Sequence, residues 1–301
     1  MTFLKPAVNL CLAFFLVILR FVVQHSPLPV LHGIGNAVGA LVFWVWPRHR
    51  RITLRNLEMV FGDQKSKRQL VRIGLETYQN EVKAVLEVFR SLVISTEEYS
   101  RWVTLEGEEN LKRALAKGRG VIAYTAHFGN FAIMGGRLFR AGYNIHILLR
   151  APHDPGVRKL LQKALESEKM PYLFDDKETV VQNCRQVLRQ NGILFMAADQ
   201  YASNGVEIEF LGLPTLFTSG PVVMASRSSA ALVPMFITRL PDERHAVSIE
   251  PEVEIAQVGG FKEKTVAVLG RLTGMLESRI REHPSQWLWL HRRWKNLKGG
   301  V

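Results

Sequence analysis

The first apolar segment of the chain covers residues 7–23 and reads AVNLCLAFFLVILRFVV, interrupted only by Asn9 and Arg20. A helix of this length spans about one bilayer, with the arginine extending toward an interface. The region before it offers only Lys5, and no small-residue cleavage site precedes His25. These features favour an uncleaved membrane anchor over a signal peptide and predict a single-pass protein.

A second apolar stretch, residues 28–46, carries His32, Asn36 and several glycines, which fits an interfacial or buried helix better than a second span. Four arginines follow it directly, at positions 48, 50, 51 and 55. Arginines beside an apolar segment are typical of the cytoplasmic side and attract anionic headgroups, although a solvated charged turn is the alternative. We expect residues 1–46 to form an anchor and interfacial segment on the inner face of a membrane, and residues 47–301 to form the remaining domain.

Beyond this region, amphipathic helices alternate with short apolar strands. The periodicity predicts helices at 66–93, 110–117, 131–140, 156–169, 177–190, 219–228 and 261–282, and strands at 120–126, 144–150, 192–198, 231–238 and 245–255. Buried strands separated by such helices indicate an α/β fold, in which a mixed sheet is flanked by helices on both faces.

Composition and charge narrow the function classes. Hydrophobic residues make up 47% of the chain, so a large core is available, and the net charge of +12 favours an anionic partner. The two cysteines, Cys11 and Cys184, form no disulfide framework or zinc pattern. Because no nucleic-acid-binding motif is recognisable, a bilayer, a phosphorylated substrate or an acidic carrier protein is the expected partner.

Two predicted strands end in residues suited to catalysis. The strand at 120–126 leads into a loop with His127, Gly129 and Asn130, in which the histidine can act as a general base and the asparagine can cap the next helix. The strand at 192–198 leads to Asp199 and Gln200. Working residues gather at such strand ends in α/β sheets, but a structural histidine and a turn or N-cap aspartate are the alternatives.

A further candidate lies near the C-terminus, where QWLWLHRRWK (residues 286–295) combines three tryptophans with Arg292 and Arg293. This combination suits an interface at which aromatic rings meet headgroups and cations meet phosphates. The alternative is a segment packed on the core.

Five segments together resemble the lauroyl and myristoyl acyltransferases that complete lipid A, within the lysophospholipid acyltransferase-like superfamily. They are RRITLRNLEMVF, VIAYTAHFGNF, LLRAPHDP, the run from ADQYASNG to ALVPMF, and HPSQWLWLHRRWK, in family order from residue 50 to residue 295. The resemblance implies a single-pass protein of the bacterial inner membrane. It also implies acyl transfer from acyl carrier protein to a glycolipid hydroxyl by a His-x-x-x-x-Asp/Glu motif, without a metal or cofactor.

The chain departs from that motif, because the position five residues after His127 is Ala132. Three explanations are open: an engineered inactivating change, another carboxylate, or a pseudoenzyme that keeps the lipid-binding scaffold. Asp199 is the first candidate for the replacing carboxylate and Glu166 the second. Glu166 also stands where the family often has an arginine.

The resulting hypothesis makes His127 the general base and residues 47–301 an acyltransferase domain. Asn130 would support the loop, Asp199 and Gln200 would be polar site residues, and Arg150, Arg292 and Arg293 would contact phosphate or the carrier. The alternatives are a different phospholipid or glycolipid acceptor, or a non-catalytic protein that binds lipid or acyl carrier.

Overall fold

The computed structural model describes residues 21–23, 25–152, 154–167, 171–175, 179–255 and 260–297. The predicted anchor at residues 7–23 therefore lies outside the described residues except for its last three. The first complete helices are α2 (Leu28–Val45), α3 (Pro47–Phe61) and α4 (Lys67–Ser91).

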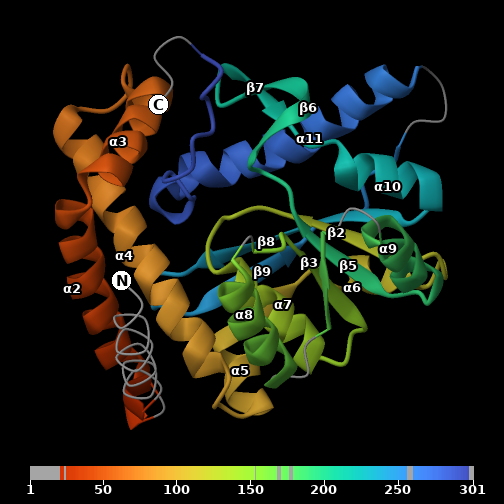
Figure 1. Cartoon of the computed structure of the whole chain (residues 1–301), viewed down its shortest axis with the longest axis horizontal. Coiled ribbons are helices and arrows are strands. Elements are labelled where there is room, and N and C mark those ends of the chain that lie inside the picture. The colour runs from red at the N-terminus through yellow and green to blue at the C-terminus, as the bar shows by residue number, and fades with distance from the viewer. Residues whose placement is uncertain are drawn as a thin grey trace.

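Helices α2 and α4 lie side by side along one flank of the molecule, as Figure 1 shows at its left. Two glycines of α2 permit this approach. A Cβ atom added to Gly39 would lie 2.5 Å from the Gln79 Cα atom, and one added to Gly35 would lie 2.5 Å from the side chain of Lys83. The glycines that weakened the prediction of a second span therefore serve helix packing.

The centre of the fold is a seven-stranded sheet with the order β1-β9-β8-β2-β5-β3-β4. All neighbouring strands are parallel except β8 and β9, which confirms a mixed sheet. The strands are β1 (Val103–Glu106), β2 (Val121–Thr125), β3 (Ile145–Leu149), β4 (Tyr172–Phe174), β5 (Ile193–Ala197), β8 (Ala231–Arg239) and β9 (His245–Ile249).

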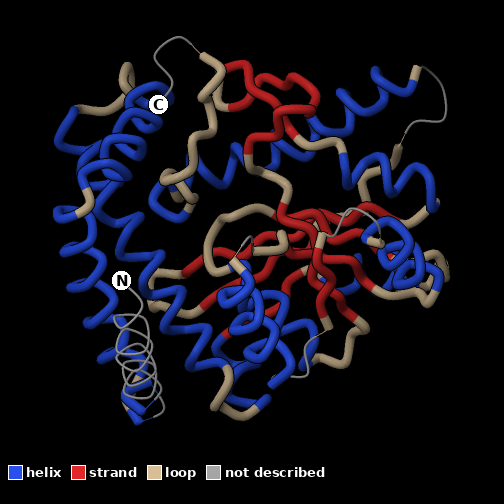
Figure 2. The backbone as a smooth tube through the Cα atoms, in the orientation of Figure 1, coloured by secondary structure: helices blue, strands red, loops and turns tan. Residues whose placement is uncertain are grey.

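Helices cover both faces of the sheet, as Figure 2 shows. Alternate residues of β2 separate the two cores: Val121 and Ala123 pack against α5 (Thr96–Trp102), α6 (Glu108–Leu115) and α7 (Phe131–Arg140). Ile122 and Tyr124 belong to the other core, with α9 (Val180–Arg189), α10 (Gly220–Ser228) and α11 (Phe261–Glu282). Helix α8 (Pro155–Ser167) precedes β4, and the hairpin β6 (Tyr201–Phe210)–β7 (Leu213–Phe217) packs on α11.

The predicted helices and strands are confirmed over the described residues, although the strand expected at 245–255 ends at Ile249. Positions 168–169 and 177–178, at the ends of two predicted helices, lie outside the described residues. Several features were not predicted: helices α3 and α5, the short strands β1 and β4, the β6–β7 hairpin and the 3₁₀ turn at Pro284–Gln286. The arginine-rich segment after α2 is a helix rather than a turn, because it buries Ile52, Leu57 and Phe61 while Arg48 and Arg51 face outward.

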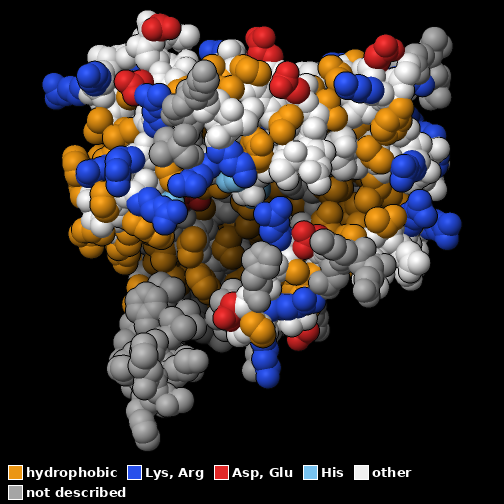
Figure 3. Space-filling view, turned by 45° about the horizontal axis from the view of Figure 1, so that its top comes forward, with side chains coloured by type: hydrophobic (Ala, Val, Ile, Leu, Met, Phe, Trp, Pro, Cys, Tyr) orange, Lys and Arg blue, Asp and Glu red, His pale blue; other side chains and the backbone are white. Residues whose placement is uncertain are grey.

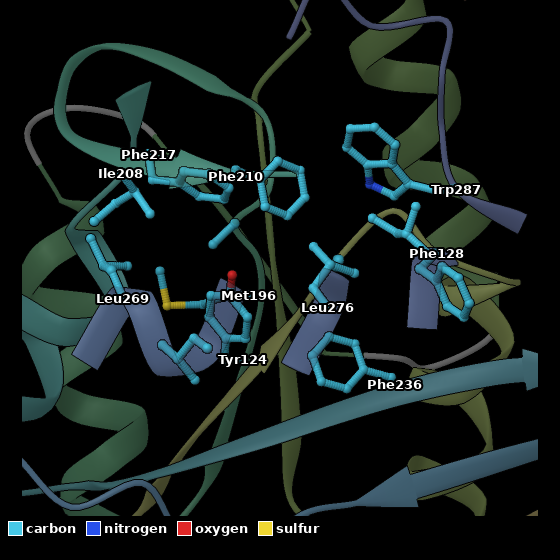
Figure 4. Packing of buried hydrophobic residues seen from close by; sticks show 14 of the residues in the cluster. Tyr124, Phe128, Met196, Ile208, Phe210, Phe217, Phe236, Leu269, Leu276 and Trp287 are labelled. Atoms are coloured by element: carbon cyan, nitrogen blue, oxygen red, sulfur yellow. The ribbon is translucent and has the colours of Figure 1, made fainter. Parts of the chain in front are cut away.

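The C-terminal tryptophans lie inside the core, so the hypothesis that they meet lipid headgroups is wrong. Trp287, Trp289 and Trp294 are at most 2% exposed and contact one another edge-on or stacked. Figure 4 shows Trp287 within the cluster that α11, the β6–β7 hairpin and the sheet form together. Burial in the core removes more of the apolar surface of these indole rings from water than a position at a membrane interface would, and this burial stabilises the fold.

Candidate active site

The two predicted strand ends meet in the structure. Strands β2 and β5 are parallel neighbours with Thr125 opposite Ala197, so the residues two positions beyond each are adjacent. His127 Nδ1 lies 2.6 Å from Asp199 Oδ1. Asp199 Oδ2 accepts hydrogen bonds from the His127 backbone N–H at 3.1 Å and from Trp287 Nε1 at 2.8 Å. One carboxylate therefore fixes both the loop and the imidazole ring.

The charges of this pair stabilise each other. Burial by itself raises the pKa of Asp199, but the charge on His127 and the three hydrogen bonds hold that pKa well below its ordinary value. Burial lowers the pKa of His127, but the charge of Asp199, its hydrogen bond to the ring and the charge of Glu81 together outweigh burial, so the net shift is upward. With Nδ1 donating to Asp199, the neutral imidazole carries its free lone pair on Nε2, which lies 3.4 Å from Gln200 Nε2.

A tight backbone turn positions His127. Gly129 has a φ of +57°, and a Cβ atom there would lie 2.1 Å from the Ile237 carbonyl oxygen of β8. The glycine therefore permits the close approach of the neighbouring strand β8. The turn is held from the other side by the segment after α11, since Gly129 N donates to Gln286 O at 2.8 Å and Leu288 N donates to His127 O at 3.1 Å.

Asn130 ties the same loop to helix α4. As predicted, it is the N-cap of α7, where its side chain accepts from Ile133 N. Its amide also donates to Ala84 O at 3.0 Å and to Glu87 Oε2 at 2.9 Å. Glu87 is 0% exposed and accepts further bonds from His32 Nε2 at 2.9 Å and from Arg239.

This cluster around Glu87 is an ion-pair network and not a cation site. Ligand atoms of His32, Glu87 and Glu243 lie within 4.8 Å of one another, the spacing that a metal ion needs. However, Arg239 bonds to both carboxylates and Lys83 Nζ lies 2.8 Å from Glu243 Oε1. The positive charge that the carboxylates require is thus supplied by the protein itself.

Two cavities border His127. The larger, of about 650 Å³, lies at the carboxyl ends of β2, β3 and β5, and its lining includes Phe131, Arg150, Gln200, Tyr201 and Lys295. The smaller, of about 150 Å³, is lined by His127, Glu81, Ala132, Val85 and Val88, among others. Figure 3 shows a hollow on one face of the molecule, lined mainly by hydrophobic side chains, with lysines and arginines along its upper rim.

The remaining predicted site residues fall into different surroundings. Arg150 borders the larger cavity with an 82% exposed side chain, and Arg292 is exposed near the C-terminus. Arg293 is 0% exposed, stacks on Phe217 and donates to Leu216 O, so it has no surface left for the predicted phosphate or carrier contact. Glu166 is exposed on α8 and borders neither cavity.

Three residues of the site were not singled out from the sequence: Trp287, Glu81 and Glu87. The tryptophan belonged to a segment interpreted as an interface. The two glutamates lie on the predicted helix at 66–93, six positions apart, and are polar residues on the side of that helix that packs inward. Such positions are unusual for glutamate and are the signal that could have identified them.

Comparison with known proteins shows the family of the chain. Residues 3–296 match the family described as bacterial lipid A biosynthesis acyltransferase, and the chain belongs to that family. The lipid A biosynthesis palmitoleoyltransferase of Escherichia coli (strain K12) is 26% identical over 280 residues, covering 91% of this chain and 88% of the relative. The lauroyltransferase of the same strain is 24% identical over 287 residues, covering 93% and 90%.

A phosphatidylinositol mannoside acyltransferase of Mycobacterium tuberculosis (strain CDC 1551 / Oshkosh) is 24% identical over 213 residues. This match covers 69% of this chain and 66% of the relative. The relatives therefore share acyl transfer, while their named acceptors differ.

Proposed function

We propose that this protein transfers a fatty acyl chain from acyl carrier protein to a hydroxyl group of a membrane glycolipid, a lipid A precursor. The observation that carries the proposal is the hydrogen-bonded His127–Asp199 pair in a chain of the lipid A acyltransferase family. In this proposal His127 is the general base, and Asp199 holds its ring and stabilises the imidazolium that forms.

The reaction centres on His127 Nε2, since Nδ1 donates to Asp199. Nε2 removes the proton from the acceptor hydroxyl while the hydroxyl oxygen attacks the carbonyl carbon of the acyl thioester. The carbon–sulfur bond then breaks, and the imidazolium returns the proton to the departing thiolate. This scheme uses neither a metal nor a cofactor.

Other residues bind and position the substrates in this scheme. Asn130 supports the loop through α4, and Gln200 lines the larger cavity beside Nε2. That cavity receives the reacting ends of the acyl chain and the acceptor. Arg150 at its border contacts a phosphate of the acceptor or an acidic group of the carrier, because a guanidinium pairs well with such oxygens. Arg292, also exposed, is a second candidate for such a contact.

The surface of α2 supports attachment to a membrane. Among the described residues, α2 is the helix long and apolar enough to cross a bilayer, with a mean hydropathy of 1.6, and only 28% of it is buried. Its exposed side carries a stripe of apolar residues, Val30, Ile34, Val38, Leu41, Trp44 and Val45. The arginines of α3 follow this stripe directly.

We infer that residues 1–46 hold the enzyme at the bacterial inner membrane by a single span, the anchor predicted at residues 7–23, with the apolar face of α2 beside it. Residues 47–301 then form the acyltransferase domain on the cytoplasmic face, where the arginines meet anionic lipid headgroups.

The test is transfer of a labelled acyl group from acyl carrier protein to a lipid A precursor in detergent. We expect turnover by the wild-type protein and a loss of about 100-fold or more in His127→Asn, because the base is removed. His283→Asn is the matched control, since that side chain is 37% exposed and lies 3.8 Å from the exposed Glu282. Equal rates for His127→Asn and the control would refute the role of His127, and absence of wild-type turnover would refute the donor–acceptor pair.

A different glycolipid acceptor is the second candidate, favoured by the similarity to phosphatidylinositol mannoside acyltransferases. Offering a mannosylated phosphatidylinositol in the same assay separates the two acceptors. A non-catalytic lipid- or carrier-binding protein, favoured by Ala132, would instead retain labelled acyl carrier without turnover of either acceptor.

A further inference from the structure

A second carboxyl group, Glu81 of α4, lies near His127 in the smaller cavity. Glu81, His127 and Ala132 line the same space of about 150 Å³. A carboxylate at position 132 would extend from α7 into this cavity, whereas the alanine leaves it open. Ala132, at the position of the missing motif carboxylate, and the carboxyl group of Glu81 from α4 therefore border the same cavity.

Glu81 differs from its neighbours on the side of α4 that faces the His127 loop, because those neighbours have hydrogen-bond partners. Asn80 donates to Ser285 O at 3.0 Å, and Ala84 O and Glu87 both accept from Asn130. Glu81 lies between these positions and is partly buried. Within the part of the chain that the structure describes, its carboxyl group makes no hydrogen bond and no ion pair within 4.0 Å. A partly buried carboxyl group without such partners costs folding free energy, so its position at this site calls for a functional explanation.

We propose that Glu81 is a positioning residue that supplies a second negative charge to His127, in place of the carboxylate that the family motif has at position 132. This inference rests on the proposed function. Asp199 already bonds to Nδ1, so Glu81 acts through its charge across the cavity and not through a hydrogen bond to the ring. The imidazolium that forms during proton transfer is then stabilised from two sides.

The electrostatics of the two groups are reciprocal. Burial raises the pKa of Glu81 to about 7, although the charge on His127 opposes this shift. In turn, Glu81 adds to the effect of Asp199 in raising the pKa of His127. Because the carboxyl group of Glu81 ionises near neutrality, its support for His127 is present above about pH 7 and is lost as the pH falls below that value.

The first test is the titration of His127, followed by NMR in detergent with isotope-labelled histidine. Glu81→Gln keeps the side-chain size and removes the charge, so the pKa of His127 should fall measurably. Glu76→Gln is the matched control on the same helix, because Glu76 pairs with Arg72 at the surface. The control should leave the titration of His127 unchanged.

The second test is the rate of acyl transfer as a function of pH. In Glu81→Gln, kcat should fall about tenfold at its plateau. The acid side of the profile should shift to lower pH, since His127 then loses its proton more readily. A purely structural role would lower activity without moving the profile. Adding Ala132→Glu to Glu81→Gln places a carboxyl group in the same cavity from α7 and should restore both the rate and the titration.

Two results would overturn the inference. One is an unchanged pKa of His127 in Glu81→Gln. The other is a large gain in rate from Ala132→Glu alone combined with no effect of Glu81→Gln, which would show that the motif carboxylate is simply missing. If the wild-type protein transfers no acyl group at all, the proposed function fails, while the titration of His127 still decides on Glu81.

Discussion

Replacing Asp199 by asparagine should disable His127 by changing which ring nitrogen carries the proton. Asp199 Oδ2 accepts from two donors, the His127 backbone N–H and Trp287 Nε1. In the variant, the amide oxygen must occupy that position, since an NH₂ group cannot accept. The NH₂ group then faces His127 Nδ1, which becomes the acceptor, and the proton moves to Nε2. The nitrogen that should remove the acceptor's proton is no longer a base.

The structure also indicates the size of the effect. A wrong tautomer in a histidine–carboxylate pair costs about 10⁴-fold in rate in the best-studied case, and we expect a loss of about 10²–10⁴-fold in kcat here. On folding, the pKa of Asp199 falls from its ordinary value of 3.8 to about 2, which adds about 2 kcal/mol to the free energy of unfolding at neutral pH. Because this pKa is lowered on folding, that contribution is present above about pH 4 and is lost between pH 4 and pH 2.

Three measurements test this prediction together. The acyl-transfer assay gives kcat, the nitrogen chemical shifts of His127 report its tautomer, and urea denaturation at pH 7 and pH 2 gives the pH-dependent part of the free energy of unfolding. Asp242→Asn is the control, because Asp242 pairs with Arg244 in an exposed turn. If Asp199→Asn kept its rate within tenfold of wild type, with the proton still on Nδ1, the assigned role of Asp199 would be refuted.

Three further substitutions test the supports of the site. Gly129→Ala should destabilise the protein by more than about 2 kcal/mol in urea denaturation. The φ of Gly129 is +57°, and the added Cβ atom would lie 2.1 Å from the Ile237 carbonyl oxygen of β8, too close for both to stay in place. Glu87→Ala should lower the free energy of unfolding by about 3 kcal/mol, since it removes the carboxylate that both Arg239 and Asn130 bind. Glu97→Ala is the control, because Glu97 forms an exposed ion pair with Arg101 that should contribute under about 1 kcal/mol. Trp287→Phe keeps an aromatic ring in the cluster and removes one hydrogen bond to Asp199, so on the proposed mechanism kcat should fall about tenfold in the transfer assay.

Each of these has a clear contrary result. A Gly129→Ala protein as stable as wild type would show that β8 yields to the added methyl group. Equal costs for the Glu87 and Glu97 substitutions would mean that burial adds nothing to the network. An unchanged kcat in Trp287→Phe would show that the other contacts suffice to orient the carboxylate.

The sequence predicted elements whose pattern reflects burial and missed those whose pattern does not. Buried strands such as β2 and amphipathic helices such as α4 show clear periodicity. Strands β1 and β4 are short edge strands, and β6 exposes many of its residues, so none of the three shows a strong alternation. Helix α3 was missed because its arginines dominated the interpretation, although its buried residues follow a helical spacing.

The site could be predicted only in part, since strand order is not visible in the sequence. His127 and Asp199 were both expected at strand ends, but their contact depends on β2 and β5 being neighbours. Glu81 and Glu87 reach the loop through packing of a helix that lies more than 40 residues earlier, as the 43-residue separation of the Asn130–Glu87 bond shows. For the same reason, composition could not decide whether Trp287 faces a membrane or the core.

The position of His32 links the outer helix to the catalytic loop. Helix α2 presents apolar side chains outward and inserts His32 inward onto Glu87, the carboxylate that also holds Asn130. Whatever binds the outer face of α2 while it is seated on α4 therefore favours the ordered loop, and by thermodynamic reciprocity an ordered loop strengthens that binding. If α2 binds a membrane as proposed above, membrane attachment and the order of this loop become one coupled equilibrium, and release from the membrane lowers the share of molecules with the ordered loop.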